Sequence, residues 1–105
     1  MSVKRPVKVK IGPSVYRILW PEETPDGADW AGLTDHYALK MFVVSANNRL
    51  MQKEVLWHEI DHGIQYVYGI QATEMDGECQ ARVRGFGGIQ VIRDNPSVMT
   101  WLMEK

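Results

Sequence analysis

The segment from Val55 to Ile64 places the strongest constraint on how this sequence can fold. It contains two histidines four residues apart, with a glutamate directly after the first, in the order His58-Glu59-Ile60-Asp61-His62. On an α-helix, residues four apart lie one above the other, so both imidazoles can face the same point. Glu59 is about 100° further round the helix and can face the same cleft. The spacing therefore favours a helix that presents two histidines and one carboxylate together.

The chemistry of these residue types points to a zinc site. Two imidazoles in this arrangement can each reach one zinc ion at about 2.0–2.1 Å. Glu59 is then free to act on a metal-bound water. The alternative interpretation is a pair of solvated helix histidines, His58 and His62, beside a glutamate that forms a salt bridge.

The residues around the motif also follow helical spacing. Their apolar positions are Leu56, Ile60, Gly63, Ile64 and Val67. On a helical wheel this apolar stripe is centred about 180° from His58, while Asp61 faces water. We therefore predict a helix from about Arg49 to Tyr68, capped by Asn47 or Asn48, with the histidines flanking the core.

Residues 1–47 carry sequence patterns typical of strands and turns. Residues 3–11 alternate between apolar and basic side chains, and Val15 to Trp20 is rich in β-branched and aromatic residues. Pro21 to Asp35 carries prolines, glycines and acidic residues, which predicts a loop, either solvated or bordering a cleft. Tyr37 to Ser45 reads as a third strand. These segments predict a small, mostly antiparallel sheet of three strands.

A second helix is expected from about Glu74 to Asp94, after a turn near Gln71. On its wheel, Glu78 lies within a stripe formed by Ala81, Gly85, Ile89 and Ile92. A carboxylate buried in such a stripe should be paired, protonated or metal-bound, because burying a bare charge costs several kcal/mol. Glu78 is therefore a candidate third zinc ligand.

Glu74 is the alternative third ligand, and the height of each residue along the helical hairpin separates the two. His62 lies about 13 Å before the turn, at 1.5 Å per helical residue. Glu78 lies about 10 Å after the turn, whereas Glu74 lies only about 4–5 Å after it. This favours Glu78 and leaves Glu74 open.

The length and composition favour one α+β domain. The chain has 105 residues, which suits a single unit made of a sheet and loop (1–47), a helical hairpin (48–95) and a terminal helix (96–105). A net charge of -1 gives no reason to expect nucleic acid or a membrane surface as a partner. We see no secretory signal or membrane span, and Cys79 is the only cysteine, so a cytoplasmic location is expected.

The motif, the second helix with its glutamate and the Arg93-Asp94-Asn95-Pro96 ending resemble the gluzincin zinc metallopeptidases, and most closely the small zincin-like proteins of bacteriophages and prophages. The likeness extends over roughly residues 32–96. It implies one zinc ion held by His58, His62 and a glutamate, with Glu59 as general base. It also implies that an extended peptide substrate pairs with the strand at 37–45. Asp61 and Arg82 differ from the larger members.

An oxyanion stabiliser would complete such a site. Tyr66, one turn beyond His62, and His36, before the third strand, are candidates, although a packed tyrosine and a surface histidine are the simpler interpretations. Two functions follow: a zinc peptidase, or a non-catalytic, zinc-stabilised binding or phage accessory protein. Neither the substrate nor the oligomeric state can be predicted from the sequence.

Overall fold

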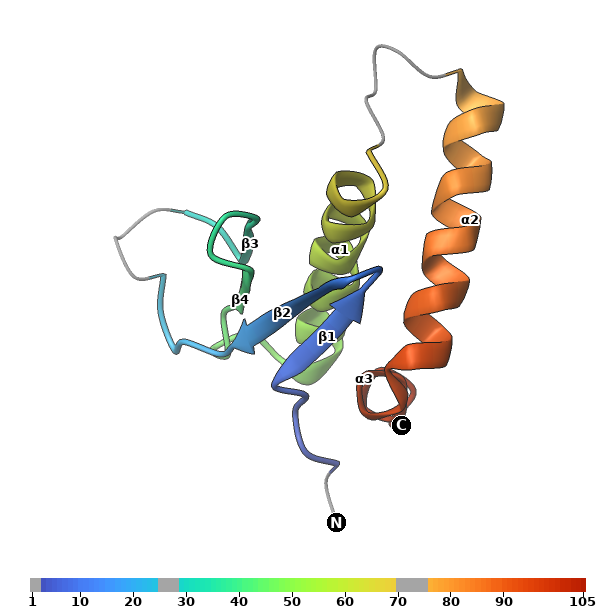
Figure 1. Cartoon of the computed structure of the whole chain (residues 1–105). Helices are drawn as coiled ribbons and strands as arrows, with labels where there is room; N and C mark the ends of the chain where they lie inside the picture. The colour runs from blue at the N-terminus through green and yellow to red at the C-terminus, as the bar shows by residue number, and fades with distance from the viewer. Residues whose placement is uncertain (1–2, 25–28, 70–75) are drawn as a thin grey trace.

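The computed structural model describes residues 3–24, 29–69 and 76–105 as an α+β fold (Figure 1). The elements occur in this order: β1 Lys8–Ile11, β2 Ser14–Leu19, β3 Gly32–Asp35, β4 Lys40–Val43, α1 Arg49–Val67, α2 Gly77–Asp94 and α3 Pro96–Leu102. The sheet elements come first and the helices follow, as the sequence predicts. None of the described helices is long and apolar enough to span a membrane.

The sheet has four strands in the order β1-β2-β4-β3. β1 and β2 form an antiparallel hairpin, β2 and β4 run parallel, and β3 and β4 run antiparallel. The expected number of three strands is therefore wrong, and the sheet is mixed, although two of its three pairings are antiparallel as expected. The strand β4 lies between β2 and β3, and it runs parallel to β2 but antiparallel to β3.

The additional strand, β3, lies inside the segment that the sequence predicts to be a loop. Its residues Gly32–Asp35 lack an alternating pattern, and pairing with β4 holds them extended. The Asp35 carboxylate accepts hydrogen bonds from the backbone N–H groups of Tyr37 and Ala38, both at 3.0 Å, and shapes the turn into β4. The strand expected at 37–45 is consequently reduced to β4.

Helices α1 and α2 cover one face of the sheet. Alternate strand residues point into this layer, and the buried ones are Val9, Ile11, Tyr16, Ile18, Met41 and Val43. They meet Leu56, Ile60 and Ile64 of α1. At Gly63 the helix lies so close to the sheet that an added Cβ would be 2.5 Å from Ile11 Cδ1.

Helix α1 agrees with its predicted limits. It begins after Asn48, whose side chain accepts a hydrogen bond from the Met51 N–H at 2.9 Å, as expected of an N-cap. Its C-terminal end is followed by Gly69 with a φ of 71°. The left-handed conformation there suits glycine and ends the helix.

Helix α2 begins at Gly77, after the N-cap Asp76, rather than at the expected position 74. Gly87 and Val91 are its buried residues. An added Cβ at Gly87 would be 2.6 Å from Ile64 Cγ2, so α1 and α2 touch closely there. The stripe predicted to be buried is instead on the outer side, with Ile89 and Ile92 each 51% exposed.

Asn95 joins the helices to the sheet. Its side chain exchanges hydrogen bonds with the backbone of Lys10, at 2.7 and 2.8 Å, and donates to the Val91 carbonyl. Asn95 directly precedes α3, which opens with Pro96, and the Asn95 side chain bonds β1 instead of capping α3.

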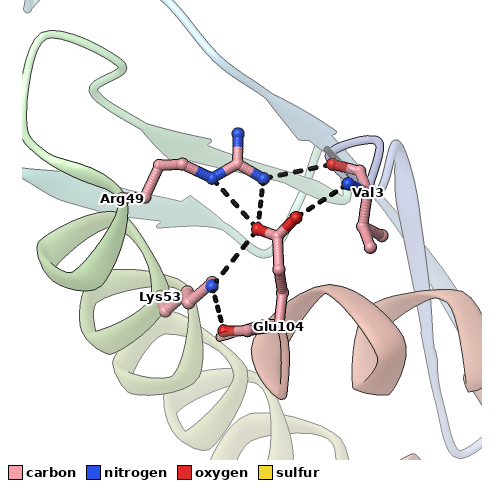
Figure 2. Close-up of polar contacts among 4 residues, drawn as sticks. All are labelled: Val3, Arg49, Lys53 and Glu104. Atoms are coloured by element: carbon pink, nitrogen blue, oxygen red, sulfur yellow. Dashed lines mark hydrogen bonds and ion pairs between the residues drawn. The ribbon is translucent and has the colours of Figure 1, made fainter. Parts of the chain in front are cut away.

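A charged junction around Glu104 joins distant parts of the chain (Figure 2). The Glu104 carboxylate accepts hydrogen bonds from the Val3 N–H at 2.7 Å and from the Arg49 guanidinium at 2.6 Å. Lys53 donates to the Glu104 carbonyl at 2.8 Å. Two residues of α1 therefore hold both the segment before β1 and the segment after α3.

Candidate metal centre

His58 and His62 project from the same side of α1, as the four-residue spacing predicts. Their Nε2 atoms are 3.0 Å apart, and their rings meet edge to face at 4.6 Å between centroids. Both side chains are exposed, because this side of α1 points away from the core. Two nitrogens at this separation can both reach a single ion at zinc–nitrogen distances of about 2.0–2.1 Å.

The Glu59 carboxylate lies beside the two histidines. One ligand atom from each of His58, Glu59 and His62 can be chosen such that all lie within 4.8 Å of one another. Unlike the histidines, Glu59 is only 6% exposed. Its Oε1 accepts a hydrogen bond of 2.8 Å from the Thr34 hydroxyl. The Glu59 carboxylate is therefore buried between β3 and the two imidazoles instead of lying in solvent.

Strand β3 forms the wall of the site opposite α1, and Gly32 allows its close approach. A Cβ at position 32 would be 2.5 Å from Val55 Cγ1 and 3.0 Å from Glu59 Oε2. Among the described residues β3 pairs only with β4, so its other side is an open edge of the sheet.

Two adjoining hollows flank this contact. One, of about 330 Å³, is lined by residues of β3 and α1 together with His36: Gly32, Leu33, Thr34, His36, His58, Glu59 and His62. The other, of about 290 Å³, is lined by Ala31, Gly32, Glu54, Val55, His58 and Glu59. Because they share Gly32, His58 and Glu59, a chain lying along β3 would have room on both sides of the motif.

The structure brings His36 and Tyr66, the two predicted oxyanion stabilisers, together. Their rings stack at 4.1 Å between centroids with an interplanar angle of 9°. Tyr16 and His36 also share a hydrogen bond of 3.0 Å between the phenol oxygen and Nδ1. Burial first, and then the nearby His62, lower the pKa of His36, which favours the neutral imidazole. Tyr66 is 54% exposed, and the ring that it stacks against belongs to His36.

The buried position predicted for Glu78 is wrong. Its side chain is 79% exposed and lies 3.6 Å from Arg82 on the same helix. It lies outside the group formed by His58, Glu59 and His62. Nine helical residues place Glu78 about 180° from Gly87, which faces α1. Glu74, the alternative, lies outside the described residues.

Asp61, one of the two departures from the larger gluzincins, has a structural role. Its carboxylate lies 3.5 Å from the Arg84 guanidinium of α2 and accepts a hydrogen bond from Gln65 at 2.9 Å. It therefore contributes to holding α2 beside α1. The helical wheel predicts that Asp61 faces water, and its side chain is 41% exposed at the contact with Arg84.

Sequence reasoning missed Thr34 and Gly32. Both lie in the segment predicted to be a loop, and neither residue type is a usual metal ligand. The alternative prediction that this loop borders a cleft is the sequence signal that points to them. Comparisons with protein-family models, curated proteins and solved structures find no match for this chain.

Proposed function

We propose that this protein is a zinc-dependent peptidase with a zincin-like site. One observation carries the proposal: a buried glutamate, Glu59, lies within 4.8 Å of two histidines whose Nε2 atoms are 3.0 Å apart. The donor set fits zinc, which prefers imidazole and carboxylate ligands. When bound, zinc would lower the pKa of a water and polarise the scissile carbonyl.

Glu59 would act as the general base, accepting a proton from the attacking water and passing it to the leaving amine. Its burial keeps bulk water from competing for the carboxylate. His36 would stabilise the developing oxyanion. With the Tyr16 hydroxyl donating to Nδ1, the Nε2 of a neutral His36 carries the proton and can donate.

The substrate would be an extended peptide. β4 is paired on both sides, so the strand expected to receive the peptide is already occupied. The open edge of β3 is next to the motif and replaces β4 in this proposal. Pairing along such an edge recognises the backbone, while adjacent hollows receive side chains.

The third protein ligand is still proposed to be Glu78 or Glu74. To reach the histidines, Glu78 would have to leave Arg82 and the first turn of α2 would have to rotate. The zinc content of Glu78→Gln and of Glu74→Gln would show which residue is the ligand, because only the substitution of the ligand should lower the zinc content.

The test of function is Glu59→Gln, assayed on a quenched fluorescent peptide library. Glutamine keeps the shape and can still accept from Thr34, but it cannot act as a base. We expect one zinc per chain and a fall in hydrolysis of about 10²- to 10⁴-fold. Unchanged hydrolysis would contradict the mechanism. Bound zinc without hydrolysis by the wild type would favour the non-catalytic binding protein.

A further inference from the structure

We infer that Thr34 is a positioning residue that holds Glu59 in its working orientation. The inference rests on the proposed function for its purpose, but the contact itself is independent of it. Thr34 is the third residue of the edge strand β3, and Glu59 is on α1, 25 residues later. Neither the motif nor its spacing involves this threonine.

The hydrogen-bond geometry shows which acceptor the hydroxyl uses. Thr34 Oγ1 is 2.8 Å from Glu59 Oε1 but 3.5 Å from the Glu59 backbone carbonyl. A hydroxyl has one proton to donate, and 2.8 Å is typical of a good O–H···O bond whereas 3.5 Å is not. The proton therefore goes to the carboxylate, where a charged acceptor makes the bond stronger.

The surroundings of the carboxylate leave it few other orientations. Among the described residues Thr34 is the only donor to it, and Gly32 of the same strand lies so near that a Cβ there would be 3.0 Å from Oε2. A long glutamate side chain would otherwise retain rotamer freedom, which costs free energy to remove at each catalytic event. By holding Oε1, Thr34 restricts rotation of the carboxylate and fixes its orientation beside His58 and His62.

The contact can be tested without hydrolysis, by thermal unfolding of the metal-free protein. Thr34→Val removes the hydroxyl and keeps the branched shape. We expect it to lower the Tm by several degrees in the wild-type background and by less than half as much in Glu59→Met, which has no acceptor. Equal losses in both backgrounds would overturn the contact. If Glu59→Met does not fold, Thr34→Ser provides the comparison, because it keeps the hydroxyl that Thr34→Val removes. Thr34→Ser should unfold at the wild-type Tm, and a Tm as low as that of Thr34→Val would overturn the contact.

The catalytic purpose is tested by kinetics of the zinc-loaded protein. Thr34→Val should lower kcat by about 10- to 100-fold, with KM and zinc content unchanged, because a misplaced base slows chemistry without weakening binding. Thr34→Ser should recover most of kcat. An unchanged kcat, or a raised KM alone, would overturn the role. No hydrolysis by the wild type would remove the proposed function and the catalytic purpose, yet leave the Tm comparison to judge the contact.

Discussion

The contact between α1 and α2 at Gly87 allows a prediction that does not depend on any activity. A methyl group added by Gly87→Ala would lie 2.6 Å from Ile64 Cγ2, and 3.1 and 3.2 Å from two carbons of the Tyr68 ring. Favourable carbon contacts occur at about 3.5–4.0 Å, so α1 and α2 would have to separate by several tenths of an ångström or more. Ile64 is 2% exposed and has little room to move.

Gly88→Ala is the matched control, because it adds the same methyl group one residue later. There a Cβ would meet nothing within 4 Å. Both substitutions gain about 1 kcal/mol from the higher helix propensity of alanine. Only Gly87→Ala also incurs the overpacking cost, typically about 1–3 kcal/mol.

We therefore expect Gly87→Ala to be less stable than Gly88→Ala by about 1–3 kcal/mol. For a domain of this size each kcal/mol shifts the Tm by about 4–8 °C. Urea unfolding and thermal melts of the two variants and the wild type would measure both quantities. If Gly87→Ala proved as stable as Gly88→Ala, the close contact between α1 and α2 would be refuted.

Two further predictions concern the charged junction and the metal. Bonds from the Val3 N–H and then from Arg49 hold the pKa of Glu104 below its ordinary 4.5, so its contribution to stability is present above that pH and is lost as the pH falls through the lowered pKa. Glu104→Gln should lower the Tm at pH 7, and the gap from wild type should close below about pH 4.5; a gap independent of pH would contradict this. His62→Ala leaves one imidazole, so bound zinc measured by mass spectrometry should fall from one per chain to nearly none; retained zinc would show that the motif is not the site.

Helix α1 could be predicted from the sequence almost to the residue, because its signals are local. An asparagine N-cap, an apolar stripe and a terminal Gly69 all act within a few positions. The grouping of His58, Glu59 and His62 could be predicted for the same reason, because the geometry of a helix alone fixes their relative positions.

The role of α2 could not be predicted, since its sequence carries two faces with similar apolar character. Ile89 and Ile92 mark the face that hydropathy selects, yet Gly87 and Val91 make the contact with α1. A glycine contributes to packing by letting another helix come close. A hydropathy pattern does not identify a glycine as a contact residue, because glycine has no apolar side chain. Because that face of α2 was predicted to be buried, Glu78, which lies on it, was also predicted to be buried.

Strand β3 was missed for a different reason. Gly32–Asp35 has no strand pattern of its own, and its extended form depends on β4, which comes later in the chain. The partners of Glu59 were missed with it, because Thr34 and Gly32 have meaning only once β3 lies against α1.

Helix α1 provides the central part of the core and also carries the candidate site. Leu56, Ile60 and Ile64 are on one side of it, and the histidines are on another. Binding at the histidines and folding of the whole domain are therefore thermodynamically linked. A ligand present at a hundred times its Kd adds about 2.7 kcal/mol to the stability of the state that binds it. If zinc binds at the histidines as proposed, the stability of the domain would report the concentration of free metal, and a chelator would lower the Tm.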